Sequence, residues 1–164
     1  MKRLLILRHA KSSWKHRDRE DHDRPLNERG RRDAPRMGAW LAERGLRPDR
    51  ILSSTARRAR KTAAEVARTS GAEAELVLSA DLYMADPNAI LEALRATPDD
   101  CETVLVVGHN PGVEDLVRRL TGQAVTMPTA ALAHIRLDIS GWPALDPGAR
   151  GELVEHQTPR ALTS

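Results

Sequence analysis

Short apolar runs alternate along this chain with segments in which apolar residues recur at helical spacing. The runs have the length and aliphatic content of buried strands, and the periodic segments have the pattern of amphipathic helices. Strands are predicted over residues 2–7, 50–53, 76–78, 102–107, 131–137 and 151–156. Helices are predicted over 56–69, 86–96 and 113–120, and over a segment that begins near Pro35 and stops at Gly45.

Pro35 decides where the first helix is expected to begin. In a helix interior its ring would clash with the preceding turn, and its missing N–H would leave a carbonyl unpaired. A stable helix is therefore predicted from Pro35 onward, with no more than a short turn from Asn27. The charged segment 11–25 is predicted to be an exposed loop, and the tail from about residue 157 is predicted to be frayed.

The alternation of strands with helices predicts the fold class. Such a pattern is typical of an α/β protein with helices layered on a mostly parallel sheet. The length of 164 residues fits one domain, 1–164, with a core of its own. Aromatic residues make up 2% of the chain and Phe is absent, so Leu, Val, Ile and Ala must fill that core.

Composition and charge exclude several classes of protein. The net charge of +3 suits anionic ligands but is too small to indicate DNA binding, and few aromatic residues are present to stack on single strands. No nucleic-acid partner is therefore expected. The single cysteine, Cys101, excludes an intrachain disulfide and fits a reducing compartment. No apolar stretch is long enough for a signal peptide or a membrane span, so we expect a cytoplasmic protein without a membrane partner.

Reactive side chains follow three of the predicted strands at the point where each strand ends. In chain order these are Arg8-His9, Ser53-Ser54 with Arg58 shortly after them, and Gly108-His109. Ligands of open α/β sheets bind beyond the carboxyl ends of the strands. Two histidines and at least two arginines are therefore expected at one rim of the sheet.

This set of side chains suits a phosphoryl group. The charge of a transferring phosphoryl is spread over three oxygens, so catalysis depends on positioning and on positive charge. Arginine provides forked donors that match phosphate, and it keeps its charge at any working pH. A histidine is largely a free imidazole near neutrality and can attack phosphorus. The start of the helix after His109 would add backbone N–H donors.

The same three segments resemble signature motifs of the histidine phosphatase (phosphoglycerate mutase-like) superfamily. LLILRHAKSSW is similar to its RHG motif, with Ala10 in place of the glycine, and ILSSTARRARKTA is similar to its S-P-x-x-R-A-x-Q-T-A segment. VLVVGHNPGV resembles the segment that holds the second histidine. The short chain, RHAKSSW and DRPLNERG further resemble the SixA-like branch of phosphohistidine phosphatases.

The resemblance implies a three-layer α/β/α sandwich with a mostly parallel central sheet, and a metal-independent phosphatase without a cofactor. In that interpretation His9 is the nucleophile and becomes phosphorylated, and water then hydrolyses the phosphohistidine. Arg8 and Arg58 bind the phosphoryl oxygens, and His109 completes the pocket. Lys15 is a further candidate phosphate ligand, because it stands where the family often has an asparagine.

The general acid has no clear candidate. Many members of the superfamily carry a glutamate that protonates the leaving oxygen, but the corresponding stretch SADLYMADPNAI contains only Asp81 and Asp86. Asp23 is a third candidate. The lack of a matching glutamate fits a P–N substrate, because an imidazole leaves more readily than an alkoxide, and it argues against a mutase.

Three functions are compatible with these residues. The first is a phosphatase that removes phosphate from phosphohistidine on a signalling protein. The second is a phosphatase for a small phosphorylated substrate such as a sugar phosphate, although the short chain leaves little room for a substrate lid. The third is a non-catalytic phosphate-binding module, for which the missing glutamate and Lys15 would be the reasons.

Other polar residues have simpler interpretations. Arg57, Arg60 and Lys61 are interpreted as a solvated helix face. DHDRPLNERG contains acidic residues and a histidine that could suggest a metal site, but a loop that leads into a helix is the preferred interpretation. The remaining histidines are expected to be structural or exposed: His16, His134 and His156.

Overall fold

The computed structural model describes residues 1–15 and 18–162. Its strands are β1 (Lys2–Arg8), β2 (Arg50–Ser54), β3 (Glu75–Ser79), β4 (Thr103–Gly108), β5 (Leu132–Leu137) and β6 (Gly151–Gln157). Its helices are α1 (Glu28–Glu43), α2 (Arg57–Ser70), α3 (Pro87–Arg95) and α4 (Gly112–Thr121). Short 3-10 turns are η1 (Asp21–Asp23), η2 (Ala80–Leu82), η3 (Trp142–Ala144) and η4 (Arg160–Leu162). All predicted strands, and the predicted helices 56–69, 86–96 and 113–120, are confirmed to within one residue at each end.

The strands form one sheet in the order β3-β2-β4-β1-β5-β6. Neighbours from β3 to β1 pair in parallel, whereas β5 is antiparallel to β1 and β6 is antiparallel to β5. Only β5 of the described sheet therefore runs against the other strands, and the predicted mostly parallel sheet is confirmed. In the pairing register Arg8 of β1 lies beside Gly108 of β4, so their carboxyl ends meet at one edge of the sheet.

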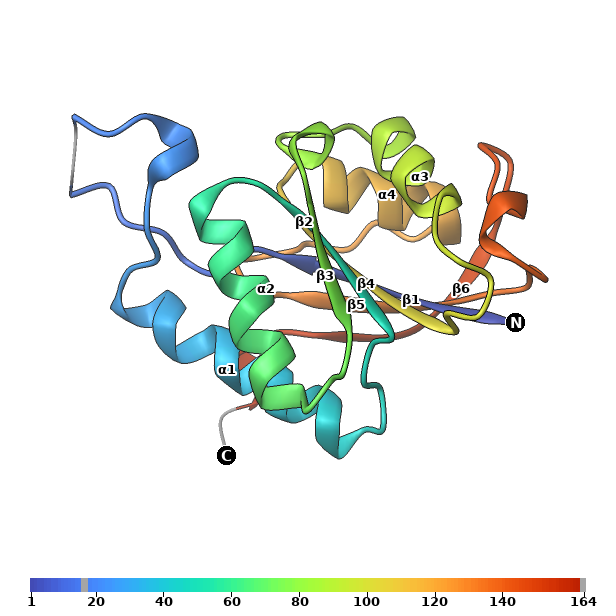
Figure 1. Cartoon of the computed structure of the whole chain (residues 1–164), viewed down its shortest axis with the longest axis horizontal. Coiled ribbons are helices and arrows are strands. Elements are labelled where there is room, and N and C mark those ends of the chain that lie inside the picture. The colour runs from blue at the N-terminus through green and yellow to red at the C-terminus, as the bar shows by residue number, and fades with distance from the viewer. Residues whose placement is uncertain (16–17, 163–164) are drawn as a thin grey trace.

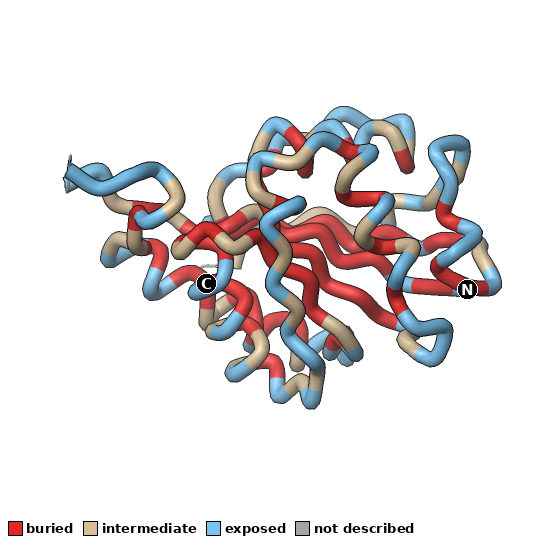
Figure 2. The backbone as a smooth tube through the Cα atoms, turned by 45° about the horizontal axis from the view of Figure 1, so that its top comes forward, coloured by how far each residue is buried: buried red, intermediate tan, exposed pale blue. Residues whose placement is uncertain are grey.

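Alternate residues of the central strands face two separate cores. Leu4 and Ile6 of β1 belong to the core that α3 and α4 cover, and Leu5 and Leu7 belong to the core that α1 and α2 cover. The two helix pairs lie on opposite faces of the sheet (Figure 1). The central strands are buried along most of their length (Figure 2). The three-layer α/β/α sandwich is therefore present.

Helix α1 begins earlier than predicted, and Pro35 lies in its interior. Asn27 caps the helix by accepting a hydrogen bond from the Gly30 N–H at 2.9 Å. The apolar face of the helix continues across the proline, because Ala34 and Met37 are both fully buried in the core shared with α2. This packing and the cap outweigh the backbone hydrogen bond lost at Pro35, which costs about 3 kcal/mol in an unsupported helix.

The segment after β6 is docked rather than frayed as far as residue 162. Arg36 of α1 donates to the Pro159 carbonyl at 3.2 Å, and Leu162 packs against the core that α1 and α2 cover. The predicted fraying is therefore wrong for residues 158–162. His134 is buried on β5 and His156 is half-buried on β6, whereas His16 lies outside the described residues. Across 1–15 and 18–162, no helix has the length and hydrophobicity needed to cross a membrane.

Candidate active site

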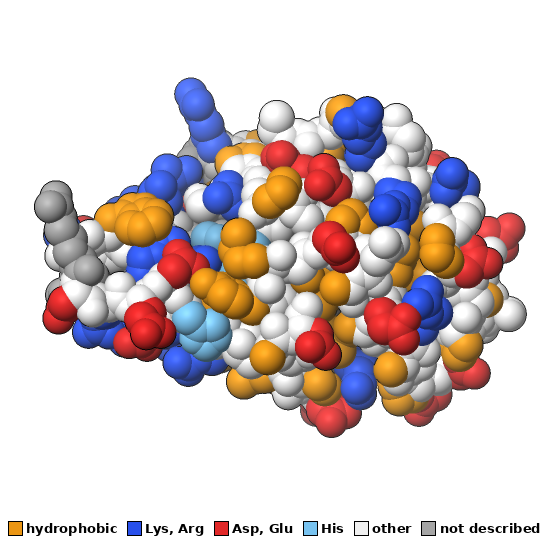
Figure 3. Space-filling view, turned by 90° about the horizontal axis from the view of Figure 1, so that it is seen from above, with side chains coloured by type: hydrophobic (Ala, Val, Ile, Leu, Met, Phe, Trp, Pro, Cys, Tyr) orange, Lys and Arg blue, Asp and Glu red, His pale blue; other side chains and the backbone are white. Residues whose placement is uncertain are grey.

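A cavity of about 330 Å³ lies at the carboxyl ends of β1 and β4. Arg8, His9, Arg58 and His109 all line it, so the structure brings together the side chains that the strand-end pattern placed at one rim. Histidine side chains are visible at the surface among Lys, Arg, Asp and Glu side chains (Figure 3).

His9 is held rigidly, with its two ring nitrogens in different roles. Its backbone N–H donates to the Gly108 carbonyl at 3.0 Å, which fixes the residue directly after β1. Its Nδ1 lies 2.8 Å from the Ala10 carbonyl, and a carbonyl can only accept, so Nδ1 carries the proton. The lone pair of His9 is therefore on Nε2. Because the side chain is only 6% exposed, this nitrogen is fixed in orientation and largely desolvated.

Arg58 connects the two histidines. Its Nε lies 3.4 Å from His9 Nε2, and its Nη2 lies 3.4 Å from His109 Nδ1. The same guanidinium donates through Nη1 to the Asp21 carbonyl at 2.7 Å and through Nη2 to the Asp21 carboxylate at 3.0 Å. Arg58 is 3% exposed, so its position is set by these contacts rather than by solvent. A guanidinium fixed beside a nucleophilic nitrogen is suited to an anionic substrate.

His109 lies opposite His9, with 5.1 Å between the ring centroids. Its Nε2 is 2.8 Å from the Ser54 hydroxyl, at the end of β2. Since Arg58 can only donate, its approach to His109 Nδ1 places the proton of the neutral ring on Nε2. The lone pair of His109 is therefore on Nδ1, where it accepts from Arg58 Nη2.

Arg8, which is half-buried at the end of β1, contributes a further cation. Its Nη1 donates to the Met127 carbonyl at 3.2 Å, while its Nε is buried without a partner among the described residues. Burial, followed by the charge of Arg58, lowers the pKa of Arg8 against the opposing effect of Glu114. A buried guanidinium N–H without a partner is costly, and an anion in the cavity would relieve this cost.

Both histidines are neutral in the free protein. Burial is the largest cause that lowers the pKa of His9 to about 3, and the nearby charges of His109, Arg58 and Arg8 add to it against the Ala10 hydrogen bond. Burial, followed by the charge of Arg58, lowers the pKa of His109 to about 4. His9 is therefore an unprotonated imidazole across the neutral and mildly acidic range.

These two pKa values predict how stability depends on pH. The histidine pKa is about 6.5 in an unfolded chain, so between that pH and the folded values only the unfolded state binds these protons. The free energy of unfolding should be at its full value above pH 6.5 and should fall by up to ~1.4 kcal/mol per pH unit for each histidine as the pH drops toward 4. Urea titrations at several pH values should show this slope, and a His9→Gln/His109→Gln variant should show a shallower one. Equal slopes would contradict neutral burial of the pair.

Comparison with known proteins decides the family. Residues 4–83 match the model of the histidine phosphatase superfamily (branch 1). SixA of Agrobacterium tumefaciens is 30% identical, with 96% of this chain and 98% of that chain aligned and a TM-score of 0.83. The chain belongs to the histidine phosphatase superfamily. Within the superfamily it falls in the SixA-like branch, and it is a phosphatase.

Two further relatives extend over nearly the whole chain. The protein histidine phosphatase SixA complexed with tungstate is 25% identical, with 98% of this chain and 99% of that chain aligned and a TM-score of 0.84. An uncharacterized protein of Mycobacterium tuberculosis, Rv1276c, is 36% identical over 165 residues, which cover 94% of this chain and all of that protein. The likeness to the superfamily thus includes β5 and β6 as well as the motif-bearing strands.

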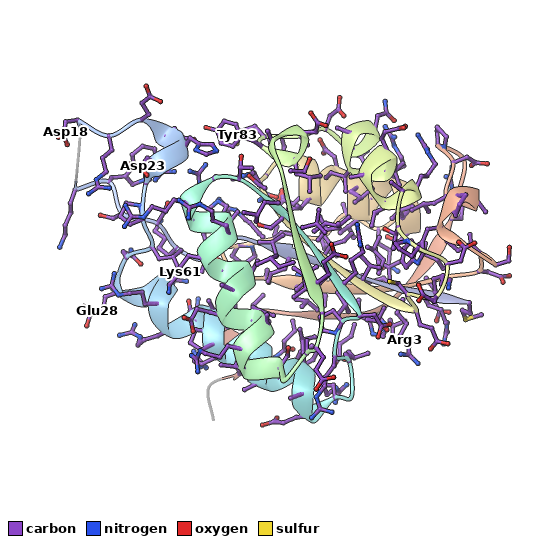
Figure 4. All side chains as sticks on the ribbon, viewed as in Figure 1. Arg3, Asp18, Asp23, Glu28, Lys61 and Tyr83 are labelled. Carbon is purple, nitrogen blue, oxygen red and sulfur yellow. The ribbon has the colours of Figure 1, made fainter. Side chains whose placement is uncertain are left out.

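The three predicted general-acid candidates do not line the cavity of this histidine phosphatase. Asp23 is exposed and pairs with Arg19, Asp81 is exposed on η2, and Asp86 caps α3. Figure 4 shows Asp23 on η1, on the loop that leads from β1 to α1. Each of these carboxylates therefore has a place in a loop or a helix start, and none is positioned to protonate a leaving group.

Asp21 is the carboxylate that the cavity does contain, and sequence reasoning missed it. Besides Arg58, it accepts hydrogen bonds from the Tyr83 hydroxyl and, at 3.1 Å, from Arg24 Nε. Burial alone would raise the pKa of Asp21, but the hydrogen bonds from Tyr83 and Arg58 and the charges of Arg58 and Arg24 lower it to about 2. Asp21 is therefore an ionised partner of the arginines and not a proton donor.

Lys15 is not among the residues that line the cavity, and Lys11 lines it instead. The reason lies in the loop after β1. Ser12 forms an isolated antiparallel bridge with Leu26, and Lys15 lies beyond it, in the loop that the bridge closes, where it is exposed. Trp14 is 68% exposed and stacks on Arg24 at 3.5 Å, where it forms part of the cavity wall.

The histidine-phosphatase site contains no metal-binding arrangement in the described part of the chain. No three His, Cys, Asp or Glu side chains of residues 1–15 and 18–162 come close enough together to hold an ion. Of the acidic loop, Asp21 is bound by the two arginines, and the His22 Nε2 lies 2.8 Å from the Thr55 hydroxyl. The donors that face the cavity are instead arginine N–H groups and imidazole nitrogens, which suit an oxyanion.

Proposed function

We propose that this phosphatase removes the phosphoryl group from phosphohistidine on a protein, through a phosphohistidine intermediate on His9. The observation that carries the proposal is that the cavity combines a nucleophile and positive charge with no protonated carboxylic acid among its described lining residues. It provides an unprotonated imidazole and the guanidinium groups of Arg8 and Arg58, but the one carboxylate among its described lining residues, Asp21, is ionised and held by Arg58 and Tyr83. Such a site attacks and binds a phosphoryl group well, but it has no carboxylic acid for an alkoxide.

In the first step His9 Nε2 attacks phosphorus. A new N–P bond forms to His9 while the N–P bond of the substrate breaks, and the electron pair stays on the substrate imidazole. That imidazole leaves as a neutral ring when its other nitrogen is protonated, which is common near its ordinary pKa of about 6.5. An alkoxide leaving group would need a proton from an acid of the enzyme.

Arg58, Arg8 and His109 would stabilise the charge that develops on the phosphoryl oxygens. Arg58 Nε already points at the His9 nitrogen, and Arg8 has a buried Nε free among the described residues. A bound dianion favours the protonated form of His109, whose Nδ1 would then donate to a phosphoryl oxygen. In the second step water attacks the phosphoryl group on His9, the N–P bond breaks, and phosphate leaves with His9 restored.

The substrate class has support from outside the site. One solved relative is named as the protein histidine phosphatase SixA, and this chain matches it over almost its full length. One wall of the cavity comes from the segment between β1 and α1 and includes Trp14, which is exposed. An exposed aromatic side chain beside the cavity would contact the surface of a protein whose phosphorylated side chain enters it. A small-molecule phosphomonoester phosphatase is the second candidate, because the same donors would bind a sugar phosphate.

The substrate class can be tested by comparing kcat/KM for three compounds. These are a chemically phosphorylated phosphohistidine peptide, p-nitrophenyl phosphate and a sugar phosphate. Without a general acid, hydrolysis of the P–N substrate should be faster than that of the sugar phosphate by about 100-fold or more, the range in which acid catalysis contributes. p-Nitrophenyl phosphate, whose leaving group is weakly basic, should lie between them. Faster turnover of the sugar phosphate would favour the second candidate.

A further inference from the structure

A second cavity, separate from the active site, lies between α2, β3 and the segment that leads into α1. It has a volume of about 420 Å³ and is called the cationic groove here. Its charged walls are Arg31, Arg57, Arg60 and Lys61, and its floor includes Leu76 and Leu78. Strand β3 is an edge strand and lies beside α2 (Figure 1).

Most of the positive charge of the groove has no acidic partner among the described residues. Neither Arg57 nor Arg60 forms an ion pair with any described residue, and no acidic side chain lines the groove in that part of the chain. Lys61 pairs with Glu65 at 3.3 Å on the helix surface, and Arg31 donates to the Leu26 carbonyl at 2.9 Å. The residues interpreted from sequence as a solvated helix face thus form one wall of a concave surface with an excess of positive charge.

The floor of the groove is apolar and exposed. Leu76 and Leu78 are 36% and 47% exposed, and their spacing of two places both side chains on one face of β3. Pro25, Leu26 and Ala64 extend this apolar lining. Two adjacent exposed leucines on an edge strand are unfavourable unless something covers them. The groove therefore combines apolar contacts with a cationic border.

The cationic groove adjoins the active site. Arg24 and Arg58 line the catalytic cavity, while their chain neighbours Pro25 and Arg57 line the groove. The two hollows therefore share a wall made by the end of the loop after β1 and the first turn of α2. Lys61, one helical turn further along α2, lies on the side of that helix toward the start of α1 (Figure 4). A ligand bound in the groove would consequently lie next to a phosphoryl group on His9.

We propose that the cationic groove docks an acidic segment, with apolar side chains interspersed, of the protein that carries the phosphohistidine. The proposal rests on the function proposed above. Unpaired arginines provide the charge complementarity for Asp and Glu, and the leucines provide the apolar contacts that a protein segment would fill. A nucleic acid would match the charge but not the leucine floor, and the groove has no aromatic side chain for stacking bases.

The test uses two phosphohistidine peptides of equal length. In one the phosphohistidine is flanked by a Glu- and Leu-rich segment, and in the other each Glu is replaced by Gln. The wild-type enzyme should hydrolyse the acidic peptide with a kcat/KM about tenfold higher, and the preference should shrink as salt is added. Equal kcat/KM values for the two peptides would overturn the docking proposal.

Two matched variants distinguish an effect of charge in the groove from an effect of the net charge of the protein. Arg60→Glu/Lys61→Glu reverses the groove, and Arg32→Glu/Arg118→Glu makes the same change in net charge on exposed positions elsewhere. Only the groove variant should lose the preference for the acidic peptide, and both should hydrolyse the free phosphohistidine amino acid at the wild-type rate. If neither peptide nor the amino acid is hydrolysed by the wild-type enzyme, the proposed function itself fails. Stronger inhibition by single-stranded RNA than by an unphosphorylated acidic peptide would overturn the proposal in favour of a nucleic acid.

Discussion

Replacing His9 by Ala should lower kcat/KM for a phosphohistidine peptide by about 10⁴-fold or more, because the substitution removes the nucleophile through which the reaction proceeds. The remaining arginines could still bind phosphate, but the reaction would then have to proceed by direct attack of water without the covalent intermediate. The backbone hydrogen bond from His9 to the Gly108 carbonyl does not depend on the side chain, so the fold should persist.

The loss should be matched by the loss of a covalent intermediate. Rapid quenching of the wild-type enzyme with a ³²P-labelled substrate should trap alkali-stable, acid-labile phosphate on the protein, and His9→Ala should trap none. His156→Ala is a suitable control, since His156 lies on β6 outside the cavity. Retention of more than a tenth of the wild-type activity by His9→Ala would show that His9 is not the nucleophile.

The residues of the candidate site that could be predicted from sequence are those fixed by the sheet. Arg8 and His9 end β1, and His109 follows β4, which pairs in parallel with β1. Their proximity follows from strand order and direction alone, and apolar periodicity was sufficient to find the strands. Arg58 follows β2 by only a few residues, so its position at the same rim was also a consequence of the sheet.

The residues that could not be predicted come from loops. Asp21 and Tyr83 meet although they are 62 positions apart, and neither belongs to a strand or helix with a periodic pattern. Their contact depends on how η1 packs against α2. No periodic pattern in the local sequence predicts this packing. Lys15 was misplaced for the same reason, since it lies in the loop beyond the bridge at Ser12, and Lys11, before that bridge, lines the cavity. The error at Pro35 was different in kind, because packing on both sides of the proline overrode a local preference.

Asp21 determines which nitrogens of Arg58 are open to a substrate. Its carboxylate and carbonyl take up both outer nitrogens of Arg58, so the free protein already holds a negative charge where a substrate must bring its own. Incoming phosphate must either share Arg58 through Nε, which faces His9, or displace the carboxylate. In both cases Asp21 keeps Arg58 in position before binding, which reduces the reorganisation that the reaction requires.

Replacing Arg58 by Ala should therefore have the second largest effect, a fall in kcat of about 10²- to 10³-fold, because it removes the donor aimed at the reacting phosphoryl group. Arg58→Lys should recover little of this loss, since an ammonium lacks the fork that reaches His9, His109 and Asp21 at once. Steady-state kinetics with the phosphohistidine peptide, together with the affinity for inorganic phosphate, would measure both effects.

A double-variant cycle separates the two consequences of losing Arg58. Removing it takes away a phosphate donor and also leaves the Asp21 carboxylate with Arg24 and Tyr83 as its remaining partners, so that more of its negative charge would repel the substrate. Arg58→Ala/Asp21→Asn should therefore bind phosphate more tightly than Arg58→Ala, while its kcat remains low. Asp21→Asn alone should lower kcat only about tenfold, because Arg58 keeps its charge and loses one fixed contact. If Asp21→Asn instead matched the loss of Arg58→Ala, the carboxylate would have a direct role in the chemistry, and its low pKa would require that role to be one of charge and not of proton donation.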